Sequence, residues 1–221
     1  MNGPDDFYTA SQRALQRDQG RAALADTVFA AIVSAEVDEA AKGFIESRDY
    51  FFLSTVDGTG MPTVSYKGGP TGVVQVDGPT AISFPSYDGN GMFKSMGNLA
   101  ETSKVGLLFM DFEVPNRIRV QGSATLTDDA VLLARWPGAK LAVRVAVESC
   151  FLNCARYIHK HRRVEVSPYV PDAEGDQPHP AWKRIDAIQP ALTDAERART
   201  QAEGGTIDQD GYVERLMSGT S

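Results

Sequence analysis

The chain has 221 residues and a net charge of −7, with 42% hydrophobic and 23% charged residues. This composition is that of an ordinary globular protein that can bury a sizeable core. The acidic balance argues against a nucleic-acid-binding protein, and the longest apolar runs, such as residues 105–110, are too short to span a membrane. Residues 1–19 are polar and lack the apolar core of a signal peptide, and there are two cysteines. We therefore expect a cytoplasmic protein.

Residues 1–43 are predicted to form helices that precede the main domain. Apolar residues such as Val28, Phe29 and Ile32 recur at intervals of three and four between good helix formers. Gly20 and Gly43 are plausible helix ends. We interpret residues 1–43 as an N-terminal helical extension.

The middle of the chain is rich in short β-strand patterns. Hydrophobic alternation and turn residues predict strands at 50–56, 61–67, 72–76, 80–84, 104–112, 117–126 and 141–147. Helices are predicted after residue 94 and at 128–136. Six or seven short strands with so few intervening helices favour an antiparallel barrel over a parallel sheet.

The C-terminal segment of the chain differs in composition. Beyond Pro171 the sequence becomes polar and proline-rich, which is typical of an exposed crossing segment. Thr193 ahead of Glu196 has the pattern of a capping box and predicts a helix at 193–202, followed by a short helix at 207–217. The predicted domains are thus 1–43, 44–171 and 172–221.

The stretch from Ser83 to Leu99 has the pattern of an anion site. An apolar run ends at Phe84, a Gly-rich turn follows at 87–91, and a helical segment carries Lys94 and Ser95 in its first turn. Free backbone N–H groups at a helix start favour negative charge, and a lysine and a serine add donors. The alternative is a simple surface turn.

Two further groups of residues carry open interpretations. Cys150, Cys154 and His159 could be imagined as metal ligands, but four ligands at zinc-site spacing are missing, so we expect buried free thiols and no metal site. The basic cluster at 156–163 is either solvated surface or the approach path of an anionic ligand.

Three segments together resemble one known family. FIESRDYFFLSTVDGTGMPTVSYKGG, FPSYDGNGMFKSMGNL and KVGLLFMDFEVPNRIRVQG are similar, in order and spacing, to the pyridoxamine 5′-phosphate oxidase-like family of FMN-binding split barrels. The resemblance implies a mainly β fold, a six-stranded antiparallel split β-barrel with N- and C-terminal helices. It also implies a homodimer that binds FMN at its interface.

The resemblance also implies where FMN binds. The strand at 63–67 would run along the isoalloxazine ring, Lys94 and Ser95 would hold the phosphate, and Arg117 would reach the flavin of the partner subunit. The implied cofactor-binding residues are Thr63, Val64, Ser65, Tyr66, Lys67, Pro85, Ser86, Asn90, Lys94, Ser95 and Arg117. No catalytic residue is assigned.

The sequence departs from the family pattern at three places. Pro62 stands where a phosphate-binding arginine is usual, and Ser95 replaces the lysine of an Arg-Lys pair. The C-terminal motif with which the family binds the phosphate of pyridoxamine 5′-phosphate is not visible, and residues 180–184 are the nearest basic segment. These departures affect the oxidation of pyridoxamine 5′-phosphate more than they affect FMN binding.

The predicted function is that of an FMN-dependent oxidoreductase acting on an unidentified small molecule. The flavin carries the redox chemistry, and the protein supplies orientation and charge near the ring. The alternatives are a flavin-binding or storage protein without turnover, and a deazaflavin-dependent reductase on the same barrel.

Overall fold

The computed structural model describes residues 3–219. The chain divides into two compact units, which we describe separately. The first extends to Val166 and includes Ala173–Gly175, and the second comprises Ser167–Asp172 and Asp176–Ser221. The predicted boundaries at residues 43 and 171 stay a prediction.

The first unit begins with short helices, as predicted. Thr9 starts α2 with a capping box, in which its side chain and that of Gln12 each accept a backbone N–H. The ring of Phe7 lies 5.4 Å from that of Phe29 and 5.6 Å from that of Phe151, so aromatic packing anchors these helices to the last strand. The helices are α1 (Pro4–Phe7), α2 (Ala10–Asp18), α3 (Ala22–Ile32) and α4 (Glu39–Glu46).

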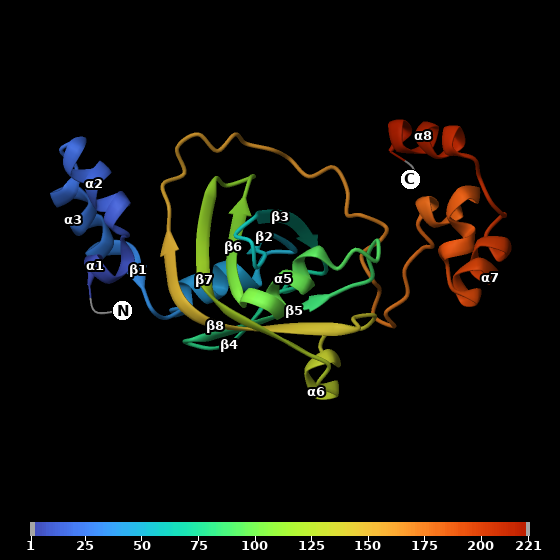
Figure 1. Cartoon of the computed structure of the whole chain (residues 1–221), viewed down its shortest axis with the longest axis horizontal. Coiled ribbons are helices and arrows are strands. Elements are labelled where there is room, and N and C mark those ends of the chain that lie inside the picture. The colour runs from blue at the N-terminus through green and yellow to red at the C-terminus, as the bar shows by residue number, and fades with distance from the viewer. Residues whose placement is uncertain (1–2, 220–221) are drawn as a thin grey trace. The chain divides into compact units, whose positions relative to one another are not determined.

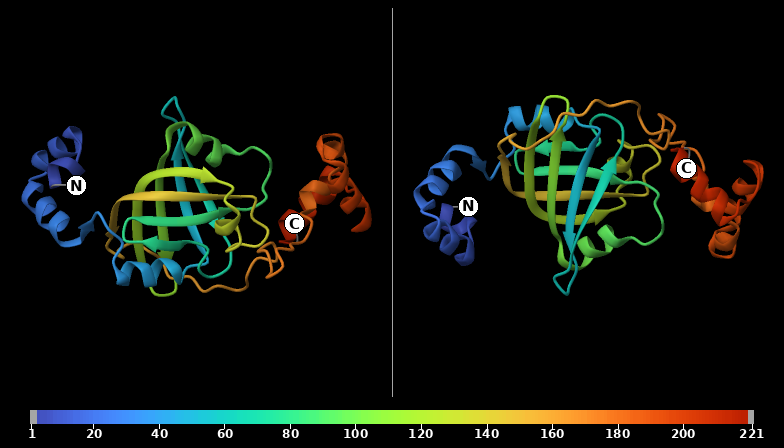
Figure 2. Two further views of the ribbon diagram at one scale, coloured as in Figure 1. Left: turned by 90° about the horizontal axis from the view of Figure 1, so that it is seen from below. Right: turned by 90° about the horizontal axis from the view of Figure 1, so that it is seen from above.

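A single antiparallel sheet forms the body of this unit and curls into a split barrel (Figures 1 and 2). Its strands are β1 (Val33–Ser34), β2 (Tyr50–Val56), β3 (Pro62–Gly68), β4 (Gln75–Gly78), β5 (Ala81–Ser86), β6 (Lys104–Asp111), β7 (Asn116–Thr127) and β8 (Leu141–Leu152). The order is β3-β2-β6-β7-β8-β5-β4, and β1 pairs with β8.

The predicted fold class is confirmed, but three details differ from the prediction. The sheet has eight strands instead of the six of the implied barrel or the seven strands predicted from the residues, and the short strand β1 was not predicted. The strand expected at 72–76 lies at 75–78, because Gly72 has a φ of 78° and belongs to the preceding turn. The predicted helix at 128–136 is the shorter α6 (Ala130–Leu133), which Asp129 caps.

The barrel core lies on one face of the sheet. Buried and half-buried residues alternate along β2, so that Phe51 and Leu53 point inward. The ring of Phe51 packs 5.0 Å from Phe84 on β5 and 5.8 Å from Phe109 on β6. Facing strands therefore share one apolar core, as the alternating pattern predicts.

The long strands bend at a β-bulge. The pairing of β7 with β8 shifts in register between Gln121 and Gly122. A Cβ atom on Gly122 would overlap the carbonyl oxygen of Ala146, so only glycine allows this close approach of two backbones. Beyond the bulge β8 continues to Leu152, five residues further than predicted.

The second unit is helical and has a polar centre. It contains the 3₁₀ helices η1 (Ala181–Arg184) and η2 (Asp186–Ala191) and the helices α7 (Asp194–Ala202) and α8 (Gln209–Ser218). The capping box of Thr193 and Glu196 is confirmed. Buried Lys183 pairs with Glu196 at 2.9 Å, and buried His179 shares a hydrogen bond of 2.9 Å with Thr200. Within residues 3–219 no helix is long and apolar enough to cross a bilayer.

Candidate functional site

The candidate site begins on β3, at one end of the strand order. Lys67, Ser65 and Thr63 pair with Phe51, Leu53 and Thr55 of β2, so they share the inner face of the sheet with the core. Within the described residues the other edge of β3 has no strand partner. This edge offers backbone N–H and C=O groups to a flat ligand.

Helix α5 (Lys94–Thr102) packs against this polar row, beside β2 and β3 (Figure 1). The hydroxyls of Ser65 and Ser95 share a hydrogen bond of 3.0 Å. Asn98 donates to the hydroxyl of Thr55 at 3.0 Å, and Thr55 in turn contacts the hydroxyl of Thr63 at 3.2 Å. The structure thus brings together two segments that the sequence analysis assigned to the same cofactor.

The start of α5 retains donors for an anion. Phe93, the residue before the helix, has a φ of 48°, and in the described chain no side chain caps the helix start. The first N–H groups of the helix lack side-chain acceptors, and the helix dipole places partial positive charge there. Lys94 is exposed, with its ammonium 3.8 Å from the carboxylate of Asp57.

Lys67 is a half-buried cation without a counter-charge. Within residues 3–219 it forms no ion pair, and burial alone lowers the pKa of its ammonium. A buried positive charge is unfavourable unless a negative group approaches it. Lys67 is therefore suited to hold an anionic group at the barrel edge.

The end of β5 comes close to the end of β3. A Cβ atom on Gly69, just beyond β3, would lie 3.4 Å from the ring of Tyr87. Pro85 is buried and Ser86 half-buried on β5, immediately before Tyr87. Burial raises the pKa of Tyr87 to about 12, so its hydroxyl stays protonated.

Asn90 lies in the exposed turn before α5. Its side-chain oxygen accepts the backbone N–H of Met92 at 3.1 Å, so this oxygen is used within its own loop. Gly91 has a φ of 76°, which the turn requires.

Arg117 lies on the opposite face of the sheet from Lys67. Arg117 lies at the start of β7 and pairs with Met110 of β6. The next residue, Ile118, points into the core, so the side chain of Arg117 points to the other face. The Nε atom of Arg117 is buried and has no hydrogen-bond partner in the described chain. Because the two faces of a sheet point apart, one chain does not bring Arg117 and Lys67 to the same ligand.

Several contributors to this site are absent from the sequence prediction. Asn98 and Thr55 form the buried polar contact that holds α5 on β2, and Asp57 lies beside Lys94. The helical pattern around residue 98 indicates a helix but not its partner strand. The DGTG turn at 57–60 shows only a turn, in which hydrogen bonds from Thr59 lower the pKa of Asp57.

The cysteines differ from the expectation in one respect. Both are free, but only Cys150 is buried, and Cys154 is exposed because β8 ends at Leu152. Burial raises the pKa of Cys150 to about 11. Hydrogen bonds from Arg156 lower that of Cys154. In residues 3–219 no group of three His, Cys, Asp or Glu side chains could hold a metal ion.

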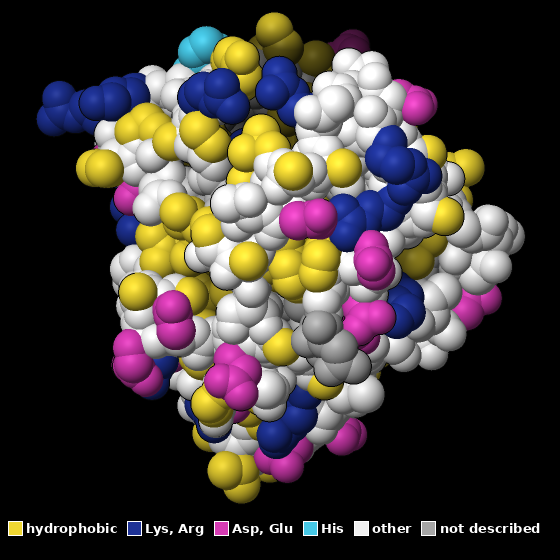
Figure 3. All heavy atoms as spheres, turned by 90° about the vertical axis from the view of Figure 1, so that its left-hand side faces the viewer, with side chains coloured by type: hydrophobic (Ala, Val, Ile, Leu, Met, Phe, Trp, Pro, Cys, Tyr) yellow, Lys and Arg dark blue, Asp and Glu magenta, His cyan; other side chains and the backbone are white. Residues whose placement is uncertain are grey.

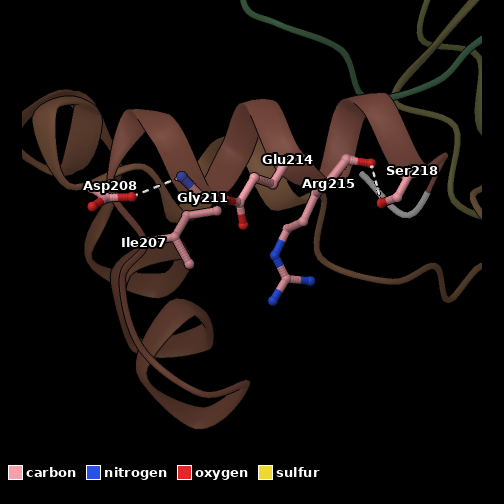
Figure 4. Close-up of a pocket in the computed structure, with 6 residues that line it drawn as sticks. All are labelled: Ile207, Asp208, Gly211, Glu214, Arg215 and Ser218. Carbon is pink, nitrogen blue, oxygen red and sulfur yellow. Dashed lines mark hydrogen bonds between the residues drawn. The ribbon is translucent and has the colours of Figure 1, made fainter.

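The basic residues at 180–184 are engaged within the second unit. Lys183 pairs with Glu196, and Arg184 donates to the carbonyl of Gly205 at 2.9 Å. A shallow pocket also lies in this unit along α8 (Figure 4). There Asp208 accepts the N–H of Gly211 at 2.8 Å. None of the predicted cofactor residues lines this pocket.

Comparison with solved structures gives several similar folds. A putative pyridoxamine 5′-phosphate oxidase from Lactobacillus delbrueckii is 22% identical, with 53% of this chain and 95% of that chain covered and a TM-score of 0.44. An FMN-binding protein from Syntrophomonas wolfei is 16% identical over 63% and 97% of the chains, with a TM-score of 0.44. HutZ, the heme storage protein from Vibrio cholerae, is 16% identical over 52% and 94%, with a TM-score of 0.39.

Comparison with curated proteins gives no match. The sequence does match the family model of pyridoxamine 5′-phosphate oxidase over residues 37–168, which is more than half of the chain. The matched region contains the whole barrel from β2 to β8 and every predicted cofactor residue. The resemblance is thereby confirmed, and the chain belongs to the pyridoxamine 5′-phosphate oxidase family.

Proposed function

We propose that the protein binds FMN and is an oxidoreductase that acts on a small molecule. The observation that carries this proposal is the contact between β3 and the start of α5. Ser65 and Ser95 share a hydrogen bond there, beside the uncapped helix start. Two lysines lie on the same two segments: Lys67 forms no ion pair in the described chain, and the exposed Lys94 has its ammonium 3.8 Å from the carboxylate of Asp57. Hydroxyls, free N–H groups and lysines are the donors that a phosphate ester requires.

The residues present fit FMN in two respects. Lys94, Ser95 and the first N–H groups of α5 would hold the phosphate, with Lys67 as a second cation. The isoalloxazine ring of FMN would lie along the free edge of β3, where its polar edge can form hydrogen bonds with the backbone groups of the strand. Bound flavin supplies the redox chemistry, while the chain orients it and excludes water.

We further propose that the protein acts as a homodimer. Val64 and Tyr66 project from the outer face of β3 with 70% and 62% of their surface exposed. Arg117 lies on the outer face as well, with a buried Nε that lacks a partner in the described chain. A second copy packed about a two-fold axis would cover the apolar side chains and bring its Arg117 to the neighbouring site.

The identity of the cofactor tests this proposal first. The protein is purified without added flavin, and its bound molecule is identified by absorbance and by mass. Flavin absorbance with the mass of FMN is the expected result. A deazaflavin, a heme or a colourless preparation that fails to take up added FMN would contradict the proposal.

A second measurement separates an enzyme from a storage protein. The flavin-loaded protein is mixed without oxygen with a nicotinamide donor or with pyridoxamine phosphate. An oxidoreductase that uses the donor loses its yellow colour and regains it in air. Flavin that stays oxidised with a panel of donors would favour storage. Because both cysteines are free, a reducing compartment such as the cytoplasm suits the protein.

A further inference from the structure

Residues 156–163 form a basic segment that the proposed function leaves unused. The segment carries Arg156, Lys160, Arg162 and Arg163 without any Asp or Glu, in a chain of net charge −7. It follows β8 and has no regular secondary structure. Figure 3 shows Lys and Arg side chains and a histidine near its upper edge, the side on which Figure 1 draws the chain after β8.

The middle of the basic segment is attached to the turn between β6 and β7. The backbone N–H of His161 donates to the carbonyl of Phe112 at 3.0 Å. The two rings also pack edge to face, with centroids 4.9 Å apart. Phe112 in turn stacks on Tyr50, and Tyr50 stacks on Tyr66 of β3. A row of rings therefore connects the segment to the strand proposed to hold the flavin.

The end of the segment reaches the start of β2. Arg163 forms an ion pair with Asp49, and its backbone N–H donates to Glu113 at 3.4 Å. Burial raises the pKa of Tyr66, Asp49 adds to this effect, and the charge of Arg163 opposes it. Through Asp49, Arg163 is held beside the start of β2, where Tyr50 stacks on Tyr66.

The beginning of the segment lies near the start of β7. The backbone N–H of Arg156 donates to the sulfur of Cys154 at 3.4 Å. The positive charges of Arg156 and Arg117 both contribute to the lowered pKa of this thiol. The segment therefore extends from the start of β7, which carries Arg117, to the neighbourhood of Tyr66 on β3.

Positive charge remains uncompensated along this path. Asp49 pairs with Arg163, and Asp111 pairs with Arg48 at 2.7 Å, so these carboxylates are already engaged. In the part of the chain that the structure describes, Lys160 and Arg162 are exposed and form no ion pair. An exposed arginine and a lysine two residues apart are well suited to a phosphate or carboxylate group.

We infer that Lys160 and Arg162 form a subsite for the phosphate or carboxylate group of the molecule that exchanges electrons with the flavin. The inference rests on the proposed function, because it places the subsite at the rim of the flavin site. The row of rings from Phe112 through Tyr50 to Tyr66 places the subsite next to the strand proposed to hold the flavin. Positive charge there also speeds the approach of an anionic substrate to an acidic protein.

Pyrophosphate is the probe for this subsite. It is titrated by calorimetry, at low ionic strength, into the full-length protein supplied with excess FMN, which occupies the proposed phosphate site at Lys94. The double variant Lys160→Ala/Arg162→Ala is expected to weaken pyrophosphate binding at least tenfold. The matched control Arg17→Ala/Lys140→Ala removes one arginine and one lysine that are also exposed. It should change binding less than twofold.

Equal binding by the two double variants, or no pyrophosphate binding by the parent protein, would overturn the inference. Loss of binding in Lys94→Ala but not in Lys160→Ala/Arg162→Ala would also overturn it. Citrate as a second probe then distinguishes carboxylate from phosphate recognition. The flavin content of each sample, read by absorbance, reports on the proposed function separately, because the double variant should retain FMN.

Discussion

The hydroxyls of Ser65 and Ser95 share a hydrogen bond of 3.0 Å although the residues are 30 positions apart. This contact joins the inner face of an edge strand to the first turn of a helix that no side chain caps in the described chain. Neither residue carries a charge, but their contact fixes where Lys94 and Lys67 lie relative to one another. The predictions below test that arrangement and the fold that supports it.

Lys94→Ala should weaken FMN binding. A charge-assisted contact to a phosphate contributes about 1.5–3 kcal/mol, so the Kd should rise roughly 10- to 100-fold. Quenching of flavin fluorescence during titration measures it. Lys104→Ala is the control, because Lys104 is exposed at the start of β6, outside the proposed site. The same affinity for Lys94→Ala and parent would argue against the site.

Lys67→Met should have opposite effects on stability and on binding. Methionine has a similar length without the charge, so the apo protein should gain stability on the order of 1 kcal/mol, since Lys67 is half-buried without an anion. FMN binding should weaken, because the second cation is lost. Urea unfolding and flavin titration measure the two effects. A stability loss with unchanged FMN affinity would show that Lys67 acts only in the fold. Lys140→Met serves as an exposed control.

Val64→Asp should convert a dimer into a monomer. Val64 is 70% exposed on the outer face of β3. A second copy packed on this face would bury the new carboxylate, and burying a charge in the interface would weaken the dimer. Light scattering measures the mass, and FMN affinity should fall together with it. The matched control is Val131→Asp on α6, where the valine is 84% exposed. A parent protein that is monomeric and still holds FMN at full stoichiometry would remove the role proposed for Arg117.

Gly122→Ala should destabilise the barrel by about 1–3 kcal/mol, the usual range for overpacking. The added methyl group would overlap the carbonyl oxygen of Ala146 at the bulge between β7 and β8. Gly106→Ala is the matched control, because its Cβ would lie 3.7 Å from Ser54 at an ordinary contact distance. Urea unfolding compares the two variants. Equal stability would show that the bulge can shift at little cost.

The ion pair between Lys183 and Glu196 should make the second unit sensitive to acid. The Lys183 ammonium, as the largest of several causes, lowers the pKa of Glu196 to about 2 from a usual value of 4.5. A carboxyl with a depressed pKa adds stability above its unfolded-state pKa and loses that stability as the pH falls. The unit should therefore lose stability between pH 4.5 and 2.

Glu196→Gln isolates this effect. It should remove this part of the pH dependence and lower the stability of the second unit at neutral pH, because the neutral amide cannot form the ion pair with Lys183. Hydrogen exchange of the α7 amides, corrected for the intrinsic effect of pH, measures both changes. Glu214→Gln on exposed α8 is the control. The same acid dependence in Glu196→Gln and parent would contradict the assignment.

The local elements were largely predictable from the sequence. The strands at 50–56 and 104–111, the start of α5 and the capping box at Thr193 each depend on a pattern within about ten residues. Such patterns report hydrophobic periodicity and turn chemistry directly. The resemblance to the family depended on the same local segments. The match to the family model over residues 37–168 confirms this resemblance.

The tertiary structure decided which of these elements meet. The pairing of Ser65 with Ser95, the position of Arg117 on the face opposite Lys67, and the attachment of the basic segment to Phe112 depend on strand order and register. No local pattern encodes these, because the free energy that selects them comes from apolar surface buried between segments distant in sequence. The sequence by itself determined the donors of the candidate site, whereas packing of the barrel core determined which donors face a common ligand.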